Sequence, residues 1–182
     1  PKVLIVQIAN INYFQLFNLP ESYDLDTDLL KLEYHKLQLD YHPDKHSSGS
    51  EKEKMSAQVV ASYINDAYQT LNSPLKRAAY ILTIKGKDVE KVDQSDLSME
   101  VLVEQMELRE SLGDLPKDDT ALQALEDLKN SAHGKIQKKQ LKFAKEIESG
   151  DLSAAKQTFH ELQFLFKLLA EIEESEEHRL GY

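Results

Sequence analysis

The decisive stretch of this sequence is Tyr41-His42-Pro43-Asp44-Lys45, which stands between two amphipathic segments. On both sides, apolar residues recur at alternating steps of four and three, the spacing that places them on one face of a helix. Because a proline disfavours helical geometry in the residue before it, the first helix must end before Pro43. Polar residues 45–50 then predict a turn between two antiparallel helices. The two stripes are Leu30, Tyr34, Leu37 and Tyr41, followed by Ala57, Ala61, Ile64, Tyr68 and Leu71.

Short helices are expected on either side of this hairpin. A first helix over Tyr13–Phe17 should end at Leu19-Pro20. Asp26 has the side chain of a good N-cap for the first long helix. Another short helix is predicted over Leu75–Lys85, where Gly86 ends it.

The remainder of the chain predicts a second helical domain. Residues 87–95 are polar and aperiodic, and they are followed by helical segments at about 97–112, 121–148 and 152 to the acidic end. With only 6 glycines and 5 prolines in 182 residues, the predicted fold is all-α. We expect an N-terminal domain over 12–86, a linker over 87–96 and a three-helix bundle over 97–182. Residues 1–11 are expected to be an upstream extension or a vector-derived segment.

Composition excludes several classes of function. The formal net charge is −10 and no broad basic surface is apparent, so nucleic acid is not an expected partner. There is no apolar run long enough to span a membrane. The sequence has no cysteine, which excludes disulfides, thiolate zinc sites and cysteine-ligated clusters on this chain. His35, His42 and His46 lack a recognised ligand spacing, so we expect no metal, no cofactor and no enzymatic activity.

His42-Pro43-Asp44, set between two antiparallel helices, resembles the signature of a J domain. Asn65-Asp66-Ala67-Tyr68 and the later Pro74, Arg77 and Tyr80 also fit the J-domain pattern. The resemblance implies that Asp44 engages the ATPase domain of a DnaK-type chaperone and that the preceding helix helps docking. The expected chaperone-binding residues are His42, Pro43, Asp44, Lys45, Lys31, His35 and Lys36.

The docking helix also carries acidic residues. Glu33 and Asp40 share it with the three basic residues, so electrostatic steering should be weak. Two interpretations stay open at this point: a single dedicated chaperone partner, or an ordinary solvated helix face.

Over about residues 12 to 175, the chain resembles the HscB/Jac family of co-chaperones in iron-sulfur cluster assembly, most of all its bacterial members. The resemblance implies delivery of an IscU-type scaffold protein to an HscA-type chaperone, in the bacterial cytoplasm or, in a eukaryote, the mitochondrial matrix. A monomer is expected. The resemblance to the HscB/Jac family rests on these stretches: Tyr13-Phe14-Gln15-Leu16-Phe17, Leu19-Pro20, Leu25-Asp26, Tyr41 to Lys45, Ser73-Pro74-Leu75, Arg77-Ala78 and Leu102 to Glu110.

Two bundle helices each have two apolar stripes, although a bundle helix is expected to bury one. In residues 97–112 the second stripe is Met99, Leu102, Val103 and Met106, and in the last helix it is Phe164, Leu165 and Leu168. Exposed apolar patches often bind proteins. By resemblance, the expected scaffold-binding residues are Leu102, Val103, Met106, Glu107, Arg109, Glu110 and Phe164.

Other interpretations of these features stay open. The second stripes could pack on the N-terminal domain or on a second copy of the chain. The protein could also be a general J-domain folding co-chaperone for DnaK, or a helical adaptor without chaperone activity. The missing Gly/Phe-rich, Cys-rich and β-rich client-binding regions argue against the general co-chaperone.

Overall fold

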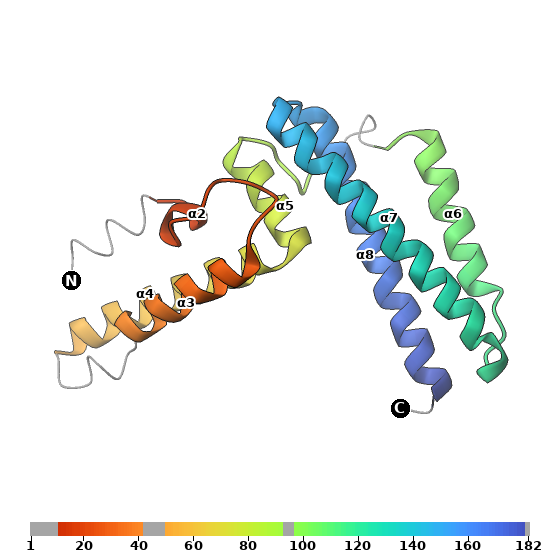
Figure 1. The fold of residues 1–182 in the computed structure, drawn as a ribbon, viewed down its shortest axis with the longest axis horizontal. Helices are drawn as coiled ribbons and strands as arrows, with labels where there is room; N and C mark the ends of the chain where they lie inside the picture. The colour runs from red at the N-terminus through yellow and green to blue at the C-terminus, as the bar shows by residue number, and fades with distance from the viewer. Residues whose placement is uncertain (1–10, 42–49, 93–96, 181–182) are drawn as a thin grey trace. The chain divides into compact units, whose positions relative to one another are not determined.

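The computed structural model describes residues 11–41, 50–92 and 97–180, and these form helices joined by short connections (Figure 1). No strand occurs within the described ranges, in agreement with the all-α prediction. The chain divides into two compact units, Pro1–Ile84 and Lys85–Tyr182. Each unit is described by itself below.

Within the described residues of the N-terminal unit there are four helices, and local capping explains where the two longest begin. The four helices are α2 (Tyr13–Leu16), α3 (Thr27–Tyr41), α4 (Glu51–Asn72) and α5 (Pro74–Ile84). The Asp26 Oδ1 atom accepts hydrogen bonds from the backbone N–H groups of Asp28 and Leu29, at 3.0 and 2.9 Å. This confirms Asp26 as the N-cap of α3. Ser50 begins α4 through a capping box with Glu53.

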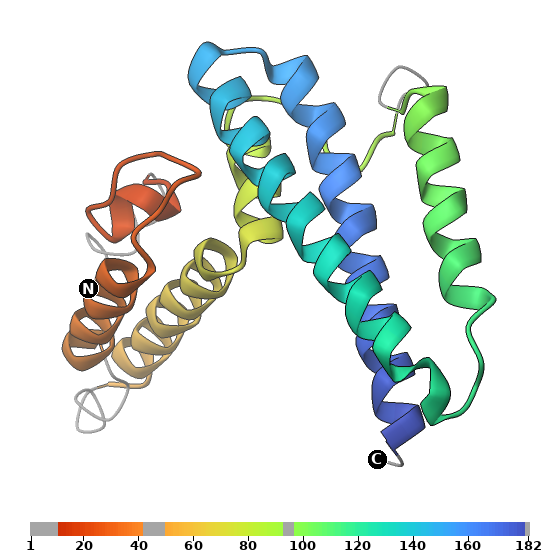
Figure 2. The same ribbon diagram turned by 45° about the vertical axis from the view of Figure 1, so that its right-hand side comes forward.

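The helices α3 and α4 pack side by side (Figure 2). The residues of the two predicted stripes are buried or half-buried. Leu30, Ile64 and Leu71 are buried, and the Tyr34 and Tyr68 rings stack with centroids 4.0 Å apart. Such aromatic pairs stabilise a packed interface beyond the area they bury. The hairpin predicted on either side of residues 41–45 is therefore present.

An aromatic cluster packs α2 against α4 and α5. The Tyr13 ring stacks on Tyr80 of α5, with centroids 4.3 Å apart, and meets the Tyr63 ring of α4 edge-on at 5.4 Å. The Tyr80 Oη atom accepts a hydrogen bond of 2.9 Å from the Tyr13 backbone N–H. Burial raises the pKa of all three phenols, so this cluster favours the protonated phenols.

Arg77 stabilises the connection between α2 and α3. Its guanidinium is buried and lies 5.2 Å from the centroid of the Tyr23 ring, in a cation–π arrangement. Burial lowers the pKa of Arg77, while Tyr23 and Asp24 oppose this shift. Arg77, part of the J-domain resemblance, is thus a structural residue of the core.

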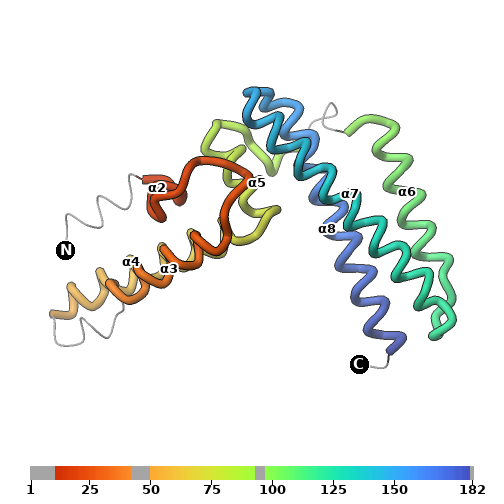
Figure 3. Tube along the Cα trace, viewed as in Figure 1, coloured from red at the N-terminus to blue at the C-terminus, as the bar shows by residue number. Residues whose placement is uncertain are grey.

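The second unit is a three-helix bundle of α6 (Met99–Gly113), α7 (Leu122–Ser149) and α8 (Leu152–Leu180), with a short 3-10 turn, η3 (Asp119–Ala121), before α7. Gly150 ends α7 with a φ of 78°, a left-handed conformation that glycine adopts without strain. The helices α7 and α8 pack along their length (Figure 3). The helix α6 packs on α8. Among the residues of α6, none is fully buried.

One prediction about α8 is wrong. The expected second apolar stripe of this helix is largely covered, since Leu165 and Leu168 are only 5% and 0% exposed. The physical reason is that α8 packs against both α6 and α7, so it buries two faces. Of the stripe Phe164, Leu165 and Leu168, only Phe164 is partly exposed.

Candidate protein-interaction sites

The predicted chaperone site combines residues of α3 with the residues that follow it in the sequence. The helix α3 ends at Tyr41 and α4 begins at Glu51, so the intervening residues join these two helix ends. The predicted site residues His42, Pro43, Asp44 and Lys45 lie outside the described residues, and their roles stay predictions.

The predicted basic residues of α3 lie on its solvent side. Lys31, His35 and Lys36 are all exposed. The Lys36 Nζ atom lies 2.6 Å from Glu33 Oε1, so an acidic neighbour offsets its charge. Asp40 is also exposed, near the C-terminal end of the helix. The expectation of weak electrostatic steering agrees with this mixed surface.

Three exposed leucines on α3 were missed by the sequence analysis. Leu29 and Leu32 are partly exposed, and Leu39 is 69% exposed. They are spaced by three and seven residues, so they share one side of the helix, opposite the buried Leu30 stripe. Their angular positions, at about 100° per residue, predict this side of α3 in the same way as the second stripe of residues 97–112. The outer side of α3 is therefore partly apolar.

The orientation of α3 is fixed by polar contacts from its inner side. The Tyr34 Oη atom donates a hydrogen bond of 2.9 Å to Asn65 Oδ1 of α4 and accepts one of 2.5 Å from Gln38 Nε2. Stacking of Tyr34 on Tyr68 adds a second constraint. These contacts hold Lys31, His35 and the leucines on the outside.

The predicted scaffold-binding residues of α6 form an exposed surface. Leu102 and Val103 are partly exposed, and Met106 is 71% exposed. Met99, which the predicted set omits, is exposed as well. The charged members Glu107, Arg109 and Glu110 are exposed on the same helix. An apolar patch with a charged rim is typical of a protein-binding surface.

Arg109 joins this surface to α8. Its guanidinium lies 5.6 Å from the centroid of the Phe164 ring, and its Nη2 atom lies 3.5 Å from Glu171 Oε1. Leu102 and Arg109 are seven residues apart, so they share one side of α6. The structure thus brings Phe164 together with the α6 members of the predicted set.

Within the described part of the chain, no three His, Asp or Glu side chains are grouped so that they could hold a metal ion. No helix within the same residues is both long and apolar enough to cross a membrane.

Comparison with known protein families agrees with this architecture. Residues 12–80 match the DnaJ domain, and residues 97–173 match the family described as the HSCB C-terminal oligomerisation domain. The Co-chaperone protein HscB homolog of Aliivibrio fischeri is 37% identical over 172 residues, which cover 94% of this chain and 100% of that protein. The homologue of Aliivibrio salmonicida is 38% identical over 173 residues.

The chain belongs to the HscB co-chaperone family. Solved structures of HscB proteins have the same fold. The chaperone HscB from Vibrio cholerae aligns with a TM-score of 0.82 at 34% identity, covering 92% of this chain and 98% of that one. The human co-chaperone HscB aligns with a TM-score of 0.83 at 25% identity, covering 91% and 82% of the two chains.

Family membership confirms the J-domain and HscB resemblances, and with them a co-chaperone role in iron-sulfur cluster assembly. Family membership does not identify the residues of this chain that contact its partners. The residues that touch a chaperone or a scaffold protein stay predictions, as does the monomeric state expected from the sequence.

Proposed function

We propose that this HscB family member stimulates the ATPase of an HscA/DnaK-type chaperone with its J domain and delivers an IscU-type scaffold protein held by its bundle. The observation that carries the proposal is that one chain combines a J-domain hairpin with an exposed apolar surface on α6. The chain itself has no site for ATP hydrolysis in this proposal, because the ATPase belongs to the partner.

On the chaperone side, Asp44 of the His42-Pro43-Asp44 motif, which follows α3 in the sequence, supplies the negative charge that triggers ATP hydrolysis in this proposal. Proline has a fixed φ and no N–H group, so it sets the direction in which the chain leaves the helix. The outer side of α3 supports docking through Lys31, His35 and Lys36. The mixed charge and exposed leucines of this side suit contacts that are partly apolar.

On the scaffold side, the apolar centre of the surface is Leu102, Val103 and Met106. A methionine as exposed as Met106 adapts easily to a partner because its side chain is flexible and polarisable. Glu107 and Glu110 give the rim a negative charge, which suits a basic partner surface. Arg109 and Phe164 extend the contact toward α8.

The two sites act together in the proposed mechanism. A scaffold protein held by the bundle is presented to the chaperone at a high effective concentration, since both are tethered to one chain. ATP hydrolysis then traps the scaffold on the chaperone. The iron-sulfur cluster is cargo of the scaffold and is not held by this protein.

The test is ATP hydrolysis by a purified HscA-type chaperone with this chain, with the scaffold protein, and with both. We expect stimulation to exceed the sum of the two single additions. Stimulation without synergy, together with binding to unfolded chains, would favour the general DnaK co-chaperone. If the chain does not stimulate ATP hydrolysis at all, the remaining interpretation is a helical adaptor without chaperone activity.

A further inference from the structure

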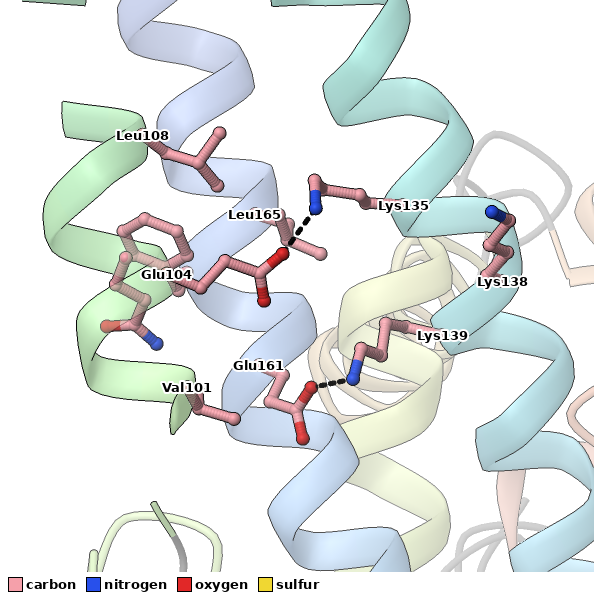
Figure 4. A pocket seen from close by; sticks show the side chains of 10 residues that line it. Val101, Glu104, Leu108, Lys135, Lys138, Lys139, Glu161 and Leu165 are labelled. Atoms are coloured by element: carbon pink, nitrogen blue, oxygen red, sulfur yellow. Dashed lines mark hydrogen bonds and ion pairs between the residues drawn. The ribbon is translucent and has the colours of Figure 1, made fainter. Parts of the chain in front are cut away.

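The bundle has a cleft whose lining shares only Phe164 with the proposed scaffold-binding surface. It has a volume of about 220 Å³ and lies among α6, α7 and α8 (Figure 4). This volume exceeds several-fold the roughly 30 Å³ that one water molecule occupies in the liquid. Its apolar lining consists of Val101, Leu108, Phe164 and Leu165. The cleft can therefore hold a large apolar side chain.

Two ion pairs border the cleft and connect its helices. Lys135 of α7 pairs with Glu104 of α6, and Lys139 of α7 pairs with Glu161 of α8. Both lysines are thus already balanced by carboxylates. Because the Lys135–Glu104 pair is partly exposed, it contributes little stability, and a bound carboxylate can compete for Lys135.

Lys138 differs from these two lysines. It lines the cleft and is exposed, and no carboxylate among the described residues pairs with it. Lys142 and Lys145 follow on the same side of α7, at steps of four and three. Lys142 has an acidic neighbour, Glu146, with Nζ and Oε1 3.5 Å apart. A row of positive charge thus leads away from the cleft, in a protein whose net charge is −10.

We propose that this cleft binds an acidic protein segment, with one large apolar side chain in the cleft and flanking carboxylates on Lys138 and Lys142. The apolar floor favours a peptide over a free phosphate, which would gain nothing from Phe164 and Leu165. The Gln105 amide in the wall can both donate to and accept from a peptide backbone. This inference does not depend on the chaperone or the scaffold.

The test uses a fluorescent synthetic peptide with one phenylalanine between two pairs of glutamates, measured by anisotropy at low ionic strength. A peptide with serine in place of the phenylalanine and one with glutamine in place of the glutamates serve as controls. We expect saturable binding of the first peptide, at least about fivefold tighter than either control. Absent saturation, or equal binding of the serine peptide, would overturn the proposal.

Protein variants locate the binding. Lys138→Glu should weaken binding about five- to tenfold, since it replaces an attraction by a repulsion. Lys167→Glu makes the same charge change at an exposed site on α8 outside the cleft lining, and it should stay within about twofold of the wild type. Equal losses in both variants would contradict the assignment to the cleft.

A variant that fills the cleft with a larger side chain tests the apolar contribution to peptide binding separately. Val101→Phe should occupy the cleft and weaken binding while Lys138 is intact. Circular dichroism establishes that each variant keeps its helices. If Val101→Phe keeps its fold and also keeps full affinity for the peptide, the apolar side chain does not enter the cleft, and the proposal is wrong.

Discussion

The guanidinium of Arg109 on α6 lies 5.6 Å from the centroid of the Phe164 ring on α8. This contact joins the two helices that supply the predicted scaffold-binding residues. Because α6 has no fully buried residue among those described, such side-chain contacts hold it to the bundle. A partner bound to Leu102 or Met106 would therefore also lie close to Arg109 and Phe164.

Replacing Phe164 should weaken scaffold binding. Phe164→Ala removes the ring on which Arg109 rests, and we expect a loss of about 1–2 kcal/mol in binding free energy by calorimetry. Leu141→Ala is the matched control, because Leu141 is an exposed apolar residue of α7 outside the predicted set. A double-mutant cycle with Arg109→Ala should show that the two losses are not additive. Equal losses for Phe164→Ala and Leu141→Ala would contradict this role.

Chaperone stimulation should depend only weakly on salt. The Lys36–Glu33 pair and the exposed Asp40 leave little net positive charge on the outer side of α3, whereas Leu32 and Leu39 are available for apolar contacts. Leu39→Ser should raise the chaperone concentration needed for half-maximal stimulation by about threefold or more. Met55→Ser, at an exposed apolar site of α4, serves as the control. A steep salt dependence with an unaffected Leu39→Ser variant would show that docking is ionic.

The hairpin should lose stability when the Tyr34 hydroxyl is removed. Tyr34→Phe keeps the stacking on Tyr68 but leaves the partly buried Asn65 Oδ1 without its donor. We expect a loss of about 1 kcal/mol in the unfolding free energy of the N-terminal unit, measured by denaturant titration. Gln69→Ala, at an exposed position of α4, should change it by less than half as much. Equal effects of the two substitutions would argue against the hydrogen bond as the cause.

The N-terminal unit should lose stability at alkaline pH. Burial is the largest cause that raises the pKa of Tyr13, Tyr63 and Tyr80 above the ordinary value of 10.0, although the hydrogen bond from the Tyr13 backbone N–H partly opposes the shift of Tyr80. The folded state therefore holds these protons more tightly than the unfolded state. The resulting stability is fully present below about pH 10 and is lost as the pH rises through the raised pKa values.

The variant Tyr63→Phe tests this linkage. It removes one titrating phenol, along with the hydrogen bond of 3.1 Å that Tyr63 donates to the Ile11 carbonyl. We expect lower stability than the wild type at about pH 8, but a shallower further fall between about pH 9 and pH 11. Denaturant titrations between about pH 8 and pH 11 measure the initial stability and its fall with pH. A fall as steep as that of the wild type would contradict the role of Tyr63.

Local rules predicted much of the fold from the sequence. Asp26 before an amphipathic stretch identified the start of α3, and Gly86 marked the end of α5. The stripe Leu30, Tyr34 and Leu37 identified the inner side of α3, because a period of 3.6 residues determines which side chains share a face. These features depend on residues close together in the chain.

Features that depend on tertiary packing were not predictable in the same way. The stripe of α8 that contains Leu165 and Leu168 was expected to be exposed, yet it is buried because α8 lies against two neighbours. A helical pattern gives the faces of one helix but not the number of helices that cover them. The Arg109–Phe164 contact and the cleft beside Lys138 likewise join residues far apart in the sequence.

The most direct test of the proposed co-chaperone function is single-turnover ATP hydrolysis by a purified HscA-type chaperone with the wild-type chain or its Asp44→Asn variant. This substitution removes one charge and keeps the size of the side chain. We predict that the wild type accelerates hydrolysis and that Asp44→Asn loses at least about nine-tenths of this acceleration. If the wild type has no effect, or if the variant stimulates equally well, the chain does not act through its J domain and the proposed function is wrong.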